Sequence, residues 1–161
     1  HSSRNIFRQM EVGAKAAKTR YVCPAESDTI YPKEYFSFVP PRDDVFYIAS
    51  PLYVCFHQRG YKRYFAPKPR GSESAMVCNR ELLLSRLKIM LSNGPEWSRT
   101  DEDRLWLIYR QKCEFFQLDT PVVTFKTDKN LHRKTPHDVE TKLFELPGYG
   151  SVKNLIQRYT A

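Results

Sequence analysis

Residues 79–94 read NRELLLSRLKIMLSNG, and this stretch decides the fold class that the sequence predicts. Asn79 suits the position just before a helix, because its side-chain oxygen can accept hydrogen bonds from the first amides of that helix. Asn93-Gly94 is a stop signal. The leucine, isoleucine and methionine side chains between them leave the helix apolar on most sides, as in a helix at the centre of a domain. We therefore predict a central helix over residues 80–91.

Four further helices are predicted along the chain. The carboxylates of Asp101-Glu102-Asp103 follow Thr100 and would stabilise the positive end of a helix dipole. Pro136 occupies the favoured first position of another helix. Serines suit the position before the first helix and before the last. The four helices are expected over residues 3–17, 100–116, 136–146 and 152–159.

β-structure is predicted in two places only. Residues 44–56 are rich in β-branched and aromatic side chains, but Pro51 stands in the middle. Because proline has no N–H to donate to a ladder, we expect two short strands there, or one edge strand with a break. Residues 121–125 suit a short strand. The predicted fold class is mainly α with a small β element (α+β): a compact helical domain with an extended, proline- and aromatic-rich N-terminal arm.

The 161 residues suit one domain, and the chain divides into three predicted parts. Residues 1–20 form a basic amphipathic N-terminal helix or arm. Residues 21–43 form an extended, proline-rich segment, because each X-Pro step disfavours helix at the preceding residue. Its aromatic side chains either fill grooves on a neighbouring surface or wrap their own domain. Residues 44–161 form a single, mainly helical domain.

The charge of the chain favours an anionic partner. Lysine and arginine number 26 against 18 acids, for a formal charge of +8. The excess is local: five basic residues and one acid lie from Arg4 to Arg20, and no acid lies from His57 to Arg70. Such stretches favour RNA, an acidic protein face or an anionic lipid surface. The alternative is that the charge serves only solubility.

The strongest candidate site is the segment HQRGYKRYFAPKPR, residues 57–70. Basic side chains alternate with aromatic ones, while glycine and two prolines keep the backbone open. The charges could neutralise phosphates and the rings could stack on exposed bases. The same groups suit a phospholipid headgroup or an acidic protein surface. The candidate partner-binding residues are Arg59, Tyr61, Lys62, Arg63, Tyr64, Lys68 and Arg70.

Catalytic and metal sites are not predicted. The only close ligand pairs are Cys55-x-His57 and His132-x4-His137, far apart in sequence, whereas a structural zinc site needs four ligands in tight pairs. No glycine-rich phosphate loop or nucleophile motif is present. The four cysteines are widely spaced, and we expect buried, reduced thiols. We predict a protein that is not an enzyme and has no cofactor. The longest apolar run, residues 45–56, is too short for a transmembrane span.

Two features point to mitochondria. Residues 2–20 are rich in Arg, Ser and Ala and nearly free of acids, the composition of a mitochondrial presequence or of the mature end left after its removal. The alternative is a basic surface helix of any protein. Residues 97–116, WSRTDEDRLWLIYRQKCEFF, resemble a segment of mitochondrial L29-type ribosomal proteins, with an acidic helix start before a Leu-Trp pair. The resemblance implies a ribosomal role and covers about an eighth of the chain.

Together these features predict a non-catalytic structural accessory subunit of a large mitochondrial multi-protein assembly. A respiratory-chain or ATP-synthase complex is expected, with the chain on the matrix side or peripheral to the inner membrane. The expected partners are other protein subunits, with an anionic phospholipid or ribosomal RNA as a further contact. The alternative prediction is a mitochondrial ribosomal protein that contacts ribosomal RNA through the basic aromatic segment.

Overall fold

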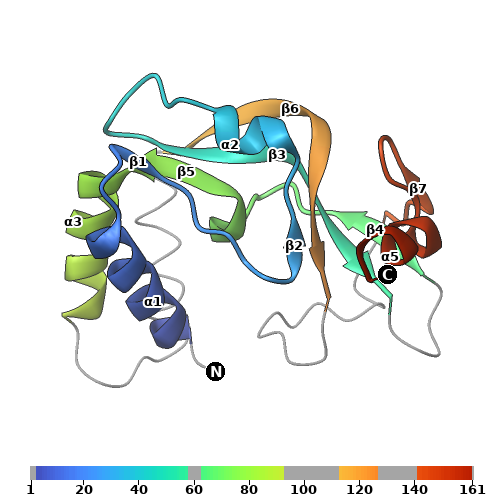
Figure 1. Cartoon of the computed structure of the whole chain (residues 1–161), viewed down its shortest axis with the longest axis horizontal. Helices are drawn as coiled ribbons and strands as arrows, with labels where there is room; N and C mark the ends of the chain where they lie inside the picture. Colours follow the sequence, from blue (N-terminus) through green and yellow to red (C-terminus); the bar gives the residue numbers. More distant parts are fainter. Residues whose placement is uncertain (1–2, 58–62, 93–112, 127–140, 161) are drawn as a thin grey trace.

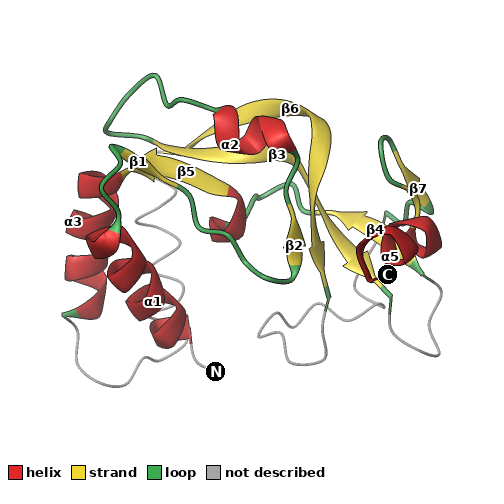
Figure 2. Cartoon of the chain, viewed as in Figure 1, coloured by secondary structure: helices red, strands yellow, loops and turns green. Residues whose placement is uncertain are grey.

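The computed structural model describes residues 3–57, 63–92, 113–126 and 141–160. They form a mixed, curled sheet with short helices around it, and helix and strand each make up 35%. The prediction of a mainly helical fold is therefore wrong. Figure 2 shows the sheet running between the helices of residues 3–16 and 80–91 at one end and the helix of residues 152–160 at the other. The helices are α1 (Ser3–Ala16), α2 (Lys33–Ser37), α3 (Arg80–Leu91) and α5 (Val152–Thr160).

Two long strands form the spine of the sheet. β3 (Phe46–Phe56) and β6 (Cys113–Phe125) run parallel along their lengths. The sheet order is β1-β5-β3-β6-β2, with β4 paired to β3, and β7 and β8 form a separate two-stranded sheet. The shorter strands are β1 (Tyr21–Val22), β2 (Thr29–Ile30), β4 (Tyr64–Pro67), β5 (Met76–Asn79), β7 (Glu145–Leu146) and β8 (Gly150–Ser151).

At Pro51, β3 changes the strand with which it pairs. Before it, β3 pairs with β5, and after it, β3 pairs with β4. The register with β6 also shifts here, since Ser50 pairs with Gln117 whereas Leu52 pairs with Val122. A proline is tolerated at such an irregularity because no regular ladder bond is lost. β3 is thus one continuous, central strand, and the expectation of two short strands or an edge strand is wrong.

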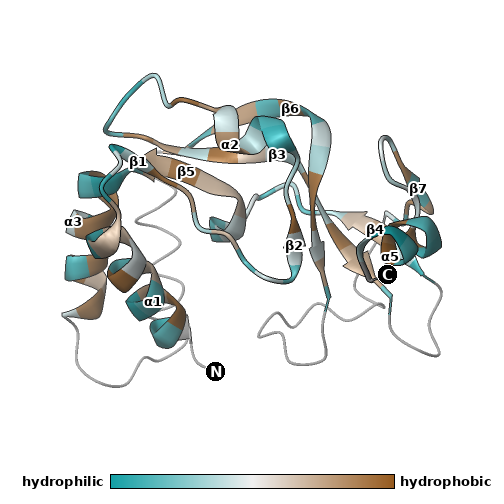
Figure 3. Ribbon diagram, viewed as in Figure 1, coloured by the Kyte–Doolittle hydropathy of each residue, from teal (hydrophilic) through white to brown (hydrophobic). Residues whose placement is uncertain are grey.

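Adjacent residues of β3 point to opposite faces of the sheet. Phe46 packs with residues of α1 and α3, whereas Tyr47 packs with the segment that contains α2. At the other end of the strand, Cys55 packs with α5. Figure 1 shows α1 and α3 side by side at one end and α5 at the other. In Figure 3, β3 and β5 are mostly hydrophobic, as expected for strands covered on both faces.

The predicted extended arm wraps its own domain. Its bounds include β1, β2 and the short helix α2. Tyr35, fully buried, donates a hydrogen bond from its hydroxyl to the Met76 carbonyl at 2.9 Å. Phe38 stacks on Phe116 of β6, with ring centroids 3.8 Å apart. These contacts place the arm on the sheet face opposite to α1 and α3.

Three of the predicted helices are confirmed. α1 and α5 lie where the sequence places them, and α3 begins after Asn79, whose side chain accepts from the amides of Glu81 and Leu82. The helix predicted to 116 is wrong at its end, because residues 113–116 belong to β6. Residues 141–146 are not helical either, since Leu143 bridges to Phe65. The remainder of these two predictions, 100–112 and 136–140, lies outside the described residues.

Gly71 is required by the fold, which gives a first expected result. Its φ is +71°, and a Cβ would lie 2.5 Å from Cγ2 of the buried Ile48. We expect Gly71→Ala to lower the free energy of unfolding by about 1–3 kcal/mol, as measured by urea denaturation. Gly13→Ala is the control: it lies within α1 with open space around it and should stabilise by roughly 0.5–1 kcal/mol. Equal effects of the two changes would contradict this role for Gly71.

Candidate functional site

The helices α1 and α3 lie antiparallel and form a basic seam. Near one end, Arg4 donates from Nη2 to the Leu91 carbonyl at 3.1 Å. Near the other end, Arg80 donates from Nη1 to the Ala17 carbonyl at 3.0 Å. The start of α1 thus lies beside the end of α3. Two segments far apart in sequence become one surface (Figure 1).

The periodicity of α1 explains why it presents basic residues to this seam. Phe7 and Ala14 are buried against α3 and the sheet, with Met10 between them. Positions three and four apart share one helix face, so Arg4, Arg8, Glu11 and Lys15 form the neighbouring stripe. Since Arg4 reaches Leu91 of α3, this stripe borders α3.

Basic residues outnumber acids along the seam. Glu11 pairs with Lys15 at 2.7 Å, and Glu81 pairs with Arg80 at 2.7 Å. Arg8, Lys18 and Lys88 are exposed, and within the described ranges no acid pairs with them. We define the basic seam as Arg4, Arg8, Lys15, Lys18, Arg80 and Lys88.

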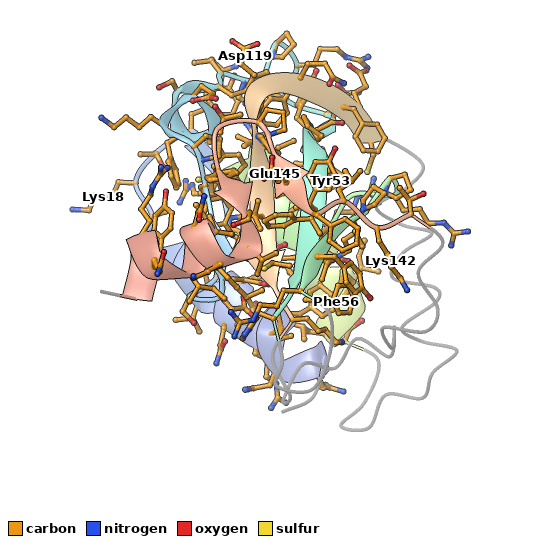
Figure 4. The ribbon with its side chains drawn as sticks, turned by 90° about the vertical axis from the view of Figure 1, so that its right-hand side faces the viewer. Lys18, Tyr53, Phe56, Asp119, Lys142 and Glu145 are labelled. Carbon is orange, nitrogen blue, oxygen red and sulfur yellow. The ribbon has the colours of Figure 1, made fainter. Side chains whose placement is uncertain are left out.

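Acidic residues collect elsewhere, along the arm and β6. Most are exposed, and Arg42 pairs with two of them, Asp44 at 3.1 Å and Glu114 at 3.4 Å. Figure 4 shows Asp119 at the upper limit of the molecule, well away from Lys18. The chain therefore separates its charges, although its net charge is positive. These acids are Glu26, Asp28, Glu34, Asp44, Glu114 and Asp119, whereas Asp43 pairs with Arg20 and accepts from Asn79, beside Arg80 of the basic seam.

The predicted basic aromatic segment is divided by the structure. Arg59, Tyr61 and Lys62 lie outside the described residues. Arg63 is exposed just before β4, and Arg70 is exposed beyond its other end. The six residues from 63 to 68 span about 16 Å when extended. The described cations of this segment thus do not form one patch.

Tyr64 is a core residue. Its side chain is 2% exposed and stacks on Phe56, with ring centroids 4.8 Å apart. Lys142 places its Nζ 5.3 Å from the centre of the same ring. Burial raises the pKa of the Tyr64 hydroxyl. Figure 4 shows Lys142 on the same side of the molecule as Phe56. The Tyr64 ring thus supports the sheet and is not presented to a partner.

Lys68 stabilises the turn after β4. Its amide donates to the Leu52 carbonyl at 2.8 Å, and its Nζ donates to Oγ of the buried Ser72 at 2.8 Å. Burial raises the pKa of the Glu73 carboxyl, and the positive charge of Lys68 opposes that rise. Lys68 is therefore partly committed to the fold, which leaves Arg63 and Arg70 as the exposed cations of this described segment.

The cysteines have the environment of structural thiols. All four are free, and Cys55 and Cys78 are fully buried. Burial raises the pKa of each of these two thiols to about 12. No group of three metal-binding side chains occurs among the residues that the structure describes. Nor is any helix in those ranges long and apolar enough to cross a membrane.

Thiol alkylation should distinguish the two kinds of cysteine, because the thiolate is the reactive form. Iodoacetamide at pH 8 should label the half-buried Cys23 and Cys113 in the native chain, and label Cys55 and Cys78 only after unfolding. Peptide mass spectrometry at several times would measure each rate. Labelling of Cys78 as fast as Cys113 in the native chain would contradict the packing of β5.

Half of the basic seam is visible in the sequence, as the excess of basic residues from Arg4 to Arg20. The contribution of α3 is not, because it depends on a helix contact across 87 residues. Comparisons add no function: no family model, no curated protein and no solved structure matches this chain. The basic seam is therefore interpreted from its own chemistry.

Proposed function

We propose that this chain is a non-catalytic structural subunit of a large mitochondrial multi-protein assembly. A respiratory-chain or ATP-synthase complex is the first candidate, with the chain on the matrix side or peripheral to the inner membrane. The observation that carries the proposal is the separation of charge between the basic seam and the acids of the arm and β6.

Two surfaces of opposite charge suit a protein that joins two different partners. Complementary potentials orient a partner and exclude the wrong one, even where they add little affinity. The basic seam suits an acidic protein face or an anionic headgroup, and the acidic surface suits a basic partner. Both surfaces lie on elements fixed by the core, since Phe7 holds α1 and Phe116 holds β6.

The mitochondrial part of the proposal rests on composition. α1 carries three basic residues, Arg4, Arg8 and Lys15, and one acid, Glu11, which is paired with Lys15. The helix also contributes Phe7 and Ala14 to the core. The basic segment is thus part of the folded protein and available to a partner in the mature assembly.

A mitochondrial ribosomal subunit is the second candidate, and the basic seam is the observation that favours it. Ribosomal proteins neutralise RNA phosphates with lysine and arginine. Arg8 and Lys15 lie seven residues apart on one stripe, about 10 Å along the helix axis. Lys88 of α3 adds a cation from the other side of the seam. A phosphate backbone could follow this row.

Sedimentation of a gently solubilised organelle lysate, with and without RNase, would test both candidates. The chain is followed by mass spectrometry. Migration with respiratory or ATP-synthase subunits that RNase leaves unchanged is expected for the first candidate. Migration with ribosomal RNA that collapses after RNase would establish the second and overturn the first. Migration as a free small protein would exclude both.

A further inference from the structure

The first half of β6 is an open sheet edge in the described part of the chain. On one side, β3 pairs with β6 as far as Gln117 and again from Val122, with residues 118–121 outside the ladder, whereas among the described strands β2 pairs on the other side only at Val123 and Thr124. The Thr120 amide donates to Oε1 of Glu34 at 3.2 Å. The edge that β3 backs regularly, residues 114–117, offers about 13 Å of backbone. Every second residue of such an edge presents its N–H and C=O outward.

This edge is held rigidly by the core. Phe116 is 8% exposed and packs against Phe38 of the arm, which fixes one face of the strand. Phe115 points to the other face, beside Gly71, and is 51% exposed. The strand thus combines an ordered backbone with an exposed aromatic ring. Those are the features of an edge to which another strand can add.

The side chains around the edge are acidic. Glu114 begins it and Asp119 lies just beyond its end, both exposed, and Glu34 and Asp44 lie beside it on the arm. Arg42 pairs with both Glu114 and Asp44, so it offsets one charge of the group. This arrangement is notable in a chain of net charge +8. We call Glu34, Asp44, Glu114 and Asp119 the acidic border.

We propose that this edge binds a basic, extended segment of a protein partner by strand addition. The backbone would supply hydrogen bonds, and the acidic border would select lysine or arginine side chains. A second copy of this chain fits poorly, because pairing of two such edges would bring two acidic borders together. Like charges directly opposite destabilise a strand pair. The surface is separate from the basic seam and goes beyond the function proposed above.

The test uses the full chain and a synthetic probe peptide. The probe has eight residues, alternates threonine with valine, and carries lysines five residues apart. The control peptide has proline in place of both central valines, which removes the N–H groups. We expect the probe to slow hydrogen exchange of those amides within residues 114–117 that do not bond to β3, and the proline peptide to leave their exchange unchanged. Binding is compared in a charge-reversed variant, Glu114→Lys with Asp119→Lys.

The charge-reversed variant should bind the probe about tenfold more weakly, because two favourable contacts become unfavourable. The matched control reverses Glu81 and Glu145, two exposed acids on other elements, and should keep the wild-type affinity. Three outcomes would overturn the proposal: protection in the free chain of the outward amides of residues 114–117, equal binding of the proline peptide, or exchange changes elsewhere only. Concentration-dependent dimerisation through these amides would assign the edge to a second copy.

Discussion

The Phe65→Ala variant is expected to lose about 3–5 kcal/mol of unfolding free energy, enough to unfold a large share of the chain at 25 °C. Phe65 is fully buried in β4. Its amide and carbonyl both bond to Leu143, at 2.7 and 2.9 Å. Its ring packs among residues of β3, β6 and α5, including Cys55 and Leu155. Truncation therefore leaves a cavity where the C-terminal elements join the sheet.

Phe144→Ala is the matched control for this cavity. The same side chain is removed from a residue that neighbours Leu143 but is 56% exposed. Its free energy of unfolding should change by less than about 0.5 kcal/mol. Urea denaturation with circular dichroism measures both variants, and an unchanged slope shows that the same surface unfolds. A Phe65→Ala variant as stable as the control would mean that α5 and β7 do not pack on the sheet.

Local signals in the sequence predicted the helices well but not the sheet. Asn79 identified the start of α3 because its capping bonds reach amides only two and three residues away. The first half of β6 had no such signal, whereas residues 121–125, where the sequence predicts a strand, do form its second half. Cys113 and Phe116 suit a helix face, yet both pair with β3, and Phe116 also packs on Phe38. β3 and Phe38 are distant from these residues in sequence. Tertiary pairing overrides local propensity at such positions.

Proline and short strands account for the other errors. Pro51 indicated an edge because proline cannot donate to a ladder, but the structure places it at a register shift within the central strand. β5 is only four residues long and runs directly into the cap of α3, so it lacks a period of its own. The sequence thus predicted too little β-structure.

Only part of the candidate site was predicted, because the rest depends on contacts between residues distant in sequence. Alternating basic and aromatic residues marked the segment 57–70, but the same alternation is typical of a strand with one face inward. Tyr64 and Phe65 proved to be strand residues, but both are buried, because this part of β4 is covered on both faces. The excess of basic residues in α1 was visible in the sequence. Its union with Arg80 and Lys88 was not, because only the antiparallel packing of α1 on α3 brings them together.

Charge reversal in the basic seam should produce the largest change in anion binding. In the double variant Arg8→Glu with Lys88→Glu, both residues are exposed and one comes from each helix. We expect its affinity for an RNA hairpin at 50 mM salt to fall roughly 10–100-fold. The slope of log affinity against log salt should become shallower by about 1.4–1.8, since each lost phosphate contact contributes about 0.7–0.9. Fluorescence anisotropy across a salt series measures both quantities.

A matched variant separates the seam from net charge. Lys33→Glu with Lys153→Glu makes the same change of charge at exposed positions of α2 and α5. Because it leaves the seam intact, its salt slope should equal that of the wild type. Equal losses in the two variants would mean that binding follows net charge, and the seam would not be a site. The same pair of variants is also tested on vesicles that contain an anionic phospholipid. If the seam variant loses vesicle binding while its RNA binding is unaffected, the seam binds a lipid surface and not RNA.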